Sequence, residues 1–140
     1  MKLQSKTFSV LFFSAFVLIG CDVDDDGFFQ STQVSPVLSA NVPDTMVIGE
    51  PYSLEVTYQK DSDCHIFSNF EVLPQGDSLV FVRAVTLFTQ ASNCSQDALA
   101  ELKDLEFVNI FETNFIFKFL KDFDDEGDPV YIDKEVIVIE

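Results

Sequence analysis

The sequence predicts an all-β fold, namely an antiparallel β-sandwich of about seven strands with one short helix around residues 97–104. Short segments rich in β-branched and aromatic residues recur along the chain, and Gly, Pro, Asn and Asp separate them. In "YSLEVTY", residues 52–58, the apolar Tyr52, Leu54, Val56 and Tyr58 alternate with polar residues. Such alternation is typical of a strand with one buried face.

The first half of the predicted domain is a series of strands and turns. Strand character begins at "VSPVL", residues 34–38, and "MVIGEP" ends in a turn at Gly49 and Pro51 before the alternating strand. "HIFSNFEVL", residues 65–73, is a further strand, which the turn "PQGDS" closes. "LVFVRAVTLF", residues 79–88, is apolar on both faces except at Arg83, and this predicts a central strand.

The second half contains the only segment with helical composition. A polar loop, residues 89–96, precedes "DALAELKD", residues 97–104, whose composition favours about two helical turns. "LEFVNIF" and "NFIFKFLK" lie on either side of "ETN", and we expect them to pair as a hairpin. "DDEGDP", residues 124–129, is a second turn, and "VYIDKEVIVI", residues 130–139, is the last strand.

This number and spacing of strands is typical of an immunoglobulin-like β-sandwich. The chain has no tryptophan, so it lacks the buried Trp of antibody domains, and its two central cysteines are only 30 residues apart. The pattern therefore predicts the architecture and not membership of that superfamily. The 16 phenylalanines are interpreted as core residues.

Residues 1–20 have the organisation of a bacterial signal peptide. Lys2 and Lys6 form a positive start, and the apolar residues 8–19 are too few for a membrane span, which needs about 20. "LIGC", residues 18–21, resembles the lipobox of bacterial lipoproteins. The resemblance implies that the chain is cut before Cys21 and that Cys21 carries a diacylglycerol thioether and fatty acyl chains. Two or more such chains hold a protein stably on a membrane.

The predicted mature chain consists of a tether, residues 21–33, and one domain, residues 34–140. All 24 acidic residues follow Cys21, whereas two of the eight basic residues precede it, so the mature charge is −18. A surface this acidic repels nucleic acid and anionic lipid. Function as a nucleic-acid-binding protein is therefore not expected.

The acidic run "DVDDD" directly follows Cys21. Its four carboxylates resemble the export signal of surface lipoproteins in Bacteroidetes-type bacteria, which implies a place in the outer leaflet of the outer membrane; they are Asp22, Asp24, Asp25 and Asp26. Asp22 alone resembles the inner-membrane retention signal of enteric bacteria, but the whole run favours export, with a periplasm-facing location as the alternative. A solvated acidic linker without a sorting role is the other interpretation of this run. A calcium loop is not expected here, because Gln33 replaces the bidentate Glu and no entering helix is possible.

Cys64 and Cys94 remain once Cys21 is assigned to lipid. In an oxidising compartment these two are expected to form a disulfide. Two free thiols, or a thiol–histidine metal site with His65, are the alternatives. His65 is the only histidine, and no nucleophile motif surrounds it, so we interpret it as structural and predict no enzymatic activity.

A second acidic cluster, residues 122–133, lies between two predicted strands. Its spacing resembles a calcium loop, with candidate ligands Asp122, Asp124, Glu126, Asp128 and Asp133. Pro129 and the flanking strands favour a solvated hairpin turn instead. Calcium is therefore a possible ligand, and no other cofactor is expected.

Three functions are compatible with these features. The first is a non-enzymatic, lipid-anchored module that is structural or binds an unknown protein, and "CHIF" after "VTY" resembles small uncharacterised surface lipoproteins of the same bacterial group. The second is calcium-dependent adhesion through residues 122–133. The third is glycan binding as an accessory to an uptake system, which exposed aromatic residues in a row would favour. "DTM" and "DSL" resemble O-glycosylation acceptors in that group, with Thr45 and Ser78 as acceptors.

Overall fold

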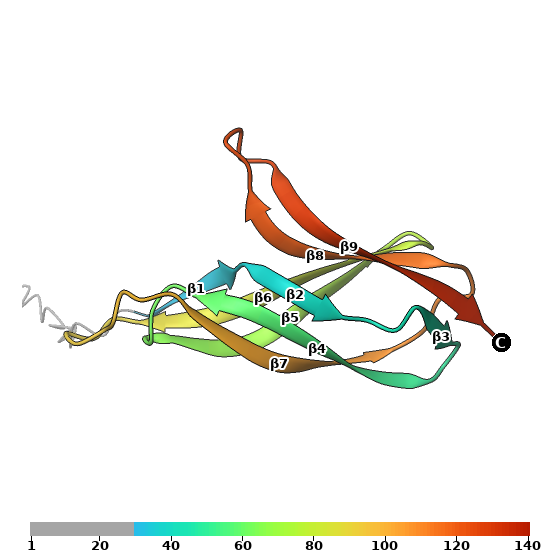
Figure 1. Cartoon of the computed structure of the whole chain (residues 1–140), viewed down its shortest axis with the longest axis horizontal. Coiled ribbons are helices and arrows are strands. Elements are labelled where there is room, and N and C mark those ends of the chain that lie inside the picture. The colour runs from blue at the N-terminus through green and yellow to red at the C-terminus, as the bar shows by residue number, and fades with distance from the viewer. Residues whose placement is uncertain (1–29) are drawn as a thin grey trace, which may run out of the picture.

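The computed structural model describes residues 30–140, which form two β-sheets with a shared core (Figure 1). The all-β prediction is confirmed. In the described residues the strands are β1 (Gln30–Ser35), β2 (Val37–Asn41), β3 (Thr45–Val47), β4 (Pro51–Lys60), β5 (His65–Gln75), β6 (Leu79–Thr89), β7 (Leu99–Val108), β8 (Phe115–Phe123) and β9 (Pro129–Ile139). Within this part of the chain, no helix is long and apolar enough to cross a membrane.

The larger sheet is organised around β6. One edge of β6 pairs with β5 along its whole length, from Gln75↔Leu79 to His65↔Phe88. Two strands share the other edge: β8 pairs in parallel with residues 79–82, and β1 pairs antiparallel with residues 84–89. The sheet continues from β8 to β9 and ends at the short β3, which is parallel to β9.

The smaller sheet has the order β2–β4–β7 and is antiparallel throughout. The chain passes from the larger to the smaller sheet at Pro36, between β1 and β2. Proline has no N–H group to donate to a strand partner, so it suits this change of sheet. Its carbonyl accepts a hydrogen bond from the N–H of Gln59 at 2.9 Å, which fixes the corner.

The core between the sheets is aromatic. Phe107 of the smaller sheet packs against Phe115 and Phe117 of the larger sheet, with ring centroids 6.0 and 4.9 Å apart. Phe111 stacks on Phe115 at 4.6 Å, and Phe119 continues the row beyond Phe117 at 5.6 Å. These five rings are all buried, which supports the interpretation of much of the phenylalanine content as core.

Several sequence predictions are confirmed in detail. In β4, Leu54, Val56 and Tyr58 are fully buried and Tyr52 is half-buried, so they share the inward face as expected. β6 is a central strand, and the turns at residues 76–78 and 124–128 each close a hairpin. Gly49 has a φ of 79° in the predicted turn before β4, a conformation that favours glycine.

Other predictions are wrong. Residues 30–140 form nine strands and not seven, and two of their pairings are parallel. Residues 97–104 are not helical, because residues 99–108 form β7 and pair with the whole of β4. "LEFVNIF" and "NFIFKFLK" do not form a hairpin, since β7 and β8 lie in different sheets. Strand β1 begins at Gln30, so residues 30–33 of the expected tether belong to the folded domain.

Candidate functional site

The hairpin between β8 and β9 projects from the body of the sandwich (Figure 1). β8 pairs with β6 only through residues 116–119, and β1 occupies the rest of that edge of β6. Beyond Phe119, β8 pairs with β9 alone, with a bulge between Leu120 and Asp122. Residues 120–133 therefore form a two-stranded arm that the larger sheet does not continue to support.

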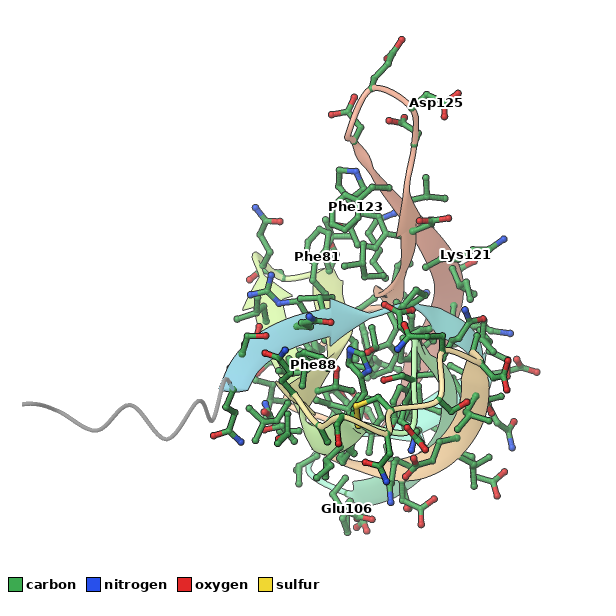
Figure 2. All side chains as sticks on the ribbon, turned by 90° about the vertical axis from the view of Figure 1, so that its left-hand side faces the viewer. Phe81, Phe88, Glu106, Lys121, Phe123 and Asp125 are labelled. Carbon is green, nitrogen blue, oxygen red and sulfur yellow. A yellow bond between two sulfur atoms is a disulfide. The ribbon has the colours of Figure 1, made fainter. Side chains whose placement is uncertain are left out.

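A cleft of about 300 Å³ lies where this arm meets the larger sheet. β5 and β6 line one side and the arm lines the other; the lining residues are Leu73, Phe81, Val82, Arg83, Leu120, Phe123, Pro129 and Tyr131. In Figure 2, Phe81 and Phe123 lie on the same side of the arm, between the arm and β5–β6. Seven of the eight lining residues are apolar or aromatic, a composition that is common in ligand pockets.

The aromatic rings of the cleft meet at an angle. The Phe81 and Tyr131 centroids are 5.4 Å apart with an interplanar angle of 69°. Lys118 places its ammonium group 5.6 Å from the Tyr131 centroid and also binds Asp133 at 2.8 Å. Phe123 is 55% exposed, an unusually open position for so large an apolar side chain. The rings of Phe81 and Tyr131 thus meet at an angle in the cleft, and the ring of Phe123 also lines it.

The cations beside the cleft already have carboxylate partners. Arg83 forms an ion pair with Glu71 on β5, as Lys118 does with Asp133. None of the five carboxylates at residues 122–128 takes part in an ion pair within the part of the chain described here. Since Lys121 is the one cation of residues 120–130, this part of the arm has a net charge of −4.

The predicted calcium ligands divide into separate groups. Asp124, Glu126 and Asp128 come together at the tip of the arm, where their carboxylate oxygens lie within 4.8 Å of one another. One oxygen of Asp124 accepts hydrogen bonds from the backbone N–H groups of Glu126 and Asp128, at 3.0 and 2.8 Å. Asp122 accepts from the N–H of Phe123, and Asp133 pairs with Lys118. The five residues do not form one site in this structure.

Cys64 and Cys94 form a disulfide, with Cα atoms 5.5 Å apart. The predicted pairing is confirmed, and the thiol–histidine metal site is therefore ruled out. His65 is 5% exposed and bridges two neutral partners: Ser62 Oγ lies 2.8 Å from Nδ1, and Gln33 Oε1 lies 2.7 Å from Nε2. Both ring nitrogens are engaged, which supports the structural interpretation of this residue.

The remaining candidates lie apart from the cleft. Thr45 on β3 and Ser78 in the β5–β6 turn are both exposed, as a glycosylation acceptor requires. Cys21, Asp22, Asp24, Asp25 and Asp26 lie outside the described residues. Comparison with protein-family models, curated proteins and solved structures gave no match for this chain.

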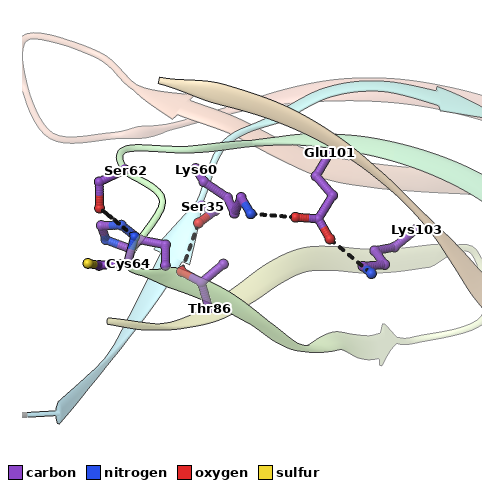
Figure 3. A network of polar contacts seen from close by, with 8 residues as sticks. Ser35, Lys60, Ser62, Cys64, Thr86, Glu101 and Lys103 are labelled. Carbon is purple, nitrogen blue, oxygen red and sulfur yellow. Dashed lines mark hydrogen bonds and ion pairs between the residues drawn. The ribbon is translucent and has the colours of Figure 1, made fainter. Parts of the chain in front are cut away.

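A charged triad links β4 and β7, with Glu101 between Lys60 and Lys103 (Figure 3). Glu101 on β7 binds Lys60 at 2.6 Å and Lys103 at 2.9 Å. These hydrogen bonds lower the pKa of the Glu101 carboxyl from 4.5 to about 2. Burial, together with the negative charge of Glu101, raises the pKa of the Tyr58 phenol. The triad places charges on the inward side of an edge strand, a known protection against unwanted strand pairing.

We expect the replacement Glu101→Gln to destabilise the fold by about 1–2 kcal/mol at neutral pH. Because the folded pKa lies below the unfolded pKa, the carboxylate stabilises the fold above about pH 4.5. That contribution is lost as the pH falls towards 2. Urea denaturation of both proteins from pH 7 to pH 2 should show the difference shrinking with acidification. Glu106→Gln is the control, and a pH-independent difference would contradict the electrostatic assignment.

Proposed function

We propose that this chain is an exported, lipid-anchored protein of the bacterial cell envelope that acts as a non-enzymatic binding module. In this proposal residues 1–20 are the signal peptide, Cys21 carries the lipid, and the acidic run directs the protein to the outer membrane surface. The folded domain then presents the arm and its cleft to the environment. A location facing the periplasm is the alternative.

The single observation that carries the binding role is the open aromatic cleft. A group of apolar side chains left accessible at the base of a projecting arm marks an interaction site more often than a random surface does. Arg83 is the one charged residue among those lining it, and it is already paired with Glu71. This lining supports the binding of a ligand and offers no acid–base pair for chemistry.

The immunoglobulin-like character of the fold is part of the proposal. Two sheets around a common core support it. The parallel pairing of β6 with β8 counts against it, because the sheets of that fold are antiparallel.

The alternative function is calcium-dependent adhesion or glycan binding. The three carboxylates at the tip of the arm support the first, and the accessible rings of Phe123 and its neighbours support the second. If calcium binds specifically, millimolar calcium will raise the melting temperature, and a variant with Asp124→Ala will lose this response. Equal melting curves with and without calcium would exclude that alternative.

We expect the export signal to be testable in intact cells. Changing Asp22, Asp24, Asp25 and Asp26 to Ala should abolish digestion of the protein by externally added protease, while leaving it in the membrane fraction. The matched control changes four carboxylates of the folded domain, Glu50, Asp104, Glu106 and Glu112, to Ala. In a separate variant, Cys21→Ser should abolish labelling of the protein by radioactive palmitate. Surface exposure that survives the removal of all four aspartates would refute the export assignment.

A further inference from the structure

We infer that the cleft under the β8–β9 arm binds a cationic segment of another protein, with an apolar side chain of that segment inserted between Phe81, Phe123 and Tyr131. This inference deepens the proposed binding function and rests on its choice of the cleft as the binding surface. It does not depend on the lipid anchor or on surface export.

The size and lining of the cleft define the part that is inserted. A volume of about 300 Å³ is at the small end of ligand pockets, so it suits one or two side chains. Leu73 forms one side and Phe123 the other, and they are 51% and 55% exposed. Covering both would remove apolar surface from water, and this is the main source of binding free energy at such sites.

The charge around the cleft defines the rest of the partner. The five carboxylates at residues 122–128 have no cationic partner in the described residues, whereas Arg83 and Lys118 are already neutralised by Glu71 and Asp133. Residues 120–130 therefore keep a net charge of −4, and the local field is negative. A segment carrying Lys or Arg beside its apolar residue would supply the missing charge and would be attracted before contact.

Two other occupants fit the observations less well. A second copy of this chain would bring together two strongly acidic surfaces, which repel each other. A sugar ring stacks best on a flat aromatic surface, but Phe81 and Tyr131 meet at 69°. A glycan also needs several polar groups, and the side chains lining the cleft provide only the guanidinium of Arg83, which is already paired, and the Tyr131 hydroxyl.

The test measures binding of synthetic peptides to the full chain in non-ionic detergent, with empty micelles as the blank. The probe is a nine-residue peptide in which Lys alternates with Leu around one central Phe. One control peptide has Glu in place of each Lys, and the other has Ser in place of each apolar residue. We expect only the first to bind, with an affinity that falls as salt rises from about 0.05 to 0.5 M.

Two variants separate the apolar and the charged contributions. Phe123→Ala should weaken binding about tenfold. Asp125→Asn, Glu126→Gln and Asp128→Asn together change the net charge of residues 120–130 from −4 to −1 and should weaken binding about threefold to tenfold, while Asp124 keeps the turn in place. Figure 2 places Asp125 and Glu106 on opposite sides of the molecule. The control triple variant Asp104→Asn, Glu106→Gln and Glu112→Gln should therefore bind within about twofold of the parent.

Several results would overturn the inference. Equal loss in the arm and control triple variants would mean that the peptide senses only the overall charge. Equal binding of the Glu-containing peptide would exclude cationic recognition. If the protein binds a glycan and Phe123→Ala abolishes that binding, the cleft is assigned to a sugar. If the protein self-associates in sedimentation and Phe123→Ala abolishes the association, the cleft is assigned to a second copy. If Phe123→Ala lowers the melting temperature, Leu73→Ala repeats the test from the opposite side of the cleft. If the peptide binds but the protein is not exposed on cells, the proposed location fails and this inference stands. If the protein is exposed but the peptide does not bind, this inference fails and the proposed location stands.

Discussion

Replacing Phe117 by Ala is expected to destabilise the protein by about 3–5 kcal/mol. The Phe117 side chain is fully buried and contacts rings of both sheets, with centroids 4.9 Å from Phe107, 5.2 Å from Phe115 and 5.6 Å from Phe119. Truncation removes the buried ring and leaves a cavity that these neighbours fill only in part. Since a domain of this size typically has a stability of about 5–15 kcal/mol, a large share is lost.

Urea denaturation followed by circular dichroism measures this effect as a lower midpoint with an unchanged slope. Phe123→Ala is the matched control because it removes the same group from a position that is 55% exposed. We expect it to cost less than about 1 kcal/mol. Equal losses for the two variants would show that Phe117 does not have the central packing role described above.

Replacing both Cys64 and Cys94 by Ala is expected to destabilise the fold by about 3.5 kcal/mol. The disulfide has a sequence separation of 30 and joins the end of the β4–β5 connection to the long connection between β6 and β7. Without it, the unfolded chain gains the freedom of a large open loop. In the folded state only weaker contacts would hold the second connection, such as the hydrogen bond from the N–H of Ser95 to Asp63 at 2.8 Å.

The same loss should follow from reduction of the parent protein with dithiothreitol, measured by the shift in melting temperature. The doubly substituted variant is its control, because the reductant should then have no effect on it. A parent protein that melts at the same temperature with and without reductant would contradict the predicted contribution of the disulfide.

The strands with regular alternation were predictable because local pattern and tertiary contacts agree in them. In β4 the residues with apolar side chains are the residues that face the core, and the turn at Gly49 sets its start. β6 is apolar on both faces except at Arg83, and both of its edges are paired as a central strand requires. The cysteine count predicted the disulfide for a chemical reason: with Cys21 assigned to lipid and export expected, two thiols remained that an oxidising compartment would join.

β7 was not predictable from composition because tertiary pairing overrode local propensity. Ala, Leu, Glu and Lys at residues 98–103 favour a helix in isolation, but ten residue pairs with β4 hold the segment extended. The alternation that buries Leu105 and Phe107 continues backwards to Lys103 and Glu101, whose charges hid it. Glu101 forms ion pairs with Lys60 and Lys103, and these pairs compensate the charges of the two side chains that face inward.

The cleft was missed for a different reason. Leu73, Phe81 and Tyr131 belong to three strands, and no spacing in the sequence shows that the outer face of one sheet is apolar. Two weak signals were available. Arg83 interrupts an apolar strand, and Phe123 extends the Phe115, Phe117 and Phe119 series beyond the core. Their meaning depends on the projection of the arm, which the competition of β1 and β8 for one edge of β6 creates.

The sharing of one edge of β6 by β1 and β8 also has a mechanical consequence. If the chain is anchored through its N-terminus and holds a partner at its arm, tension enters at Gln30 and leaves through β8. Six residue pairs, from Gln30↔Thr89 to Ser35↔Ala84, hold β1 on β6, so they lie on the path of this tension. β6 connects the two strands under tension. The hydrogen bonds of β6 with β1 and β8 therefore determine how long the folded protein survives under force, because that time is set by the rate of forced unfolding.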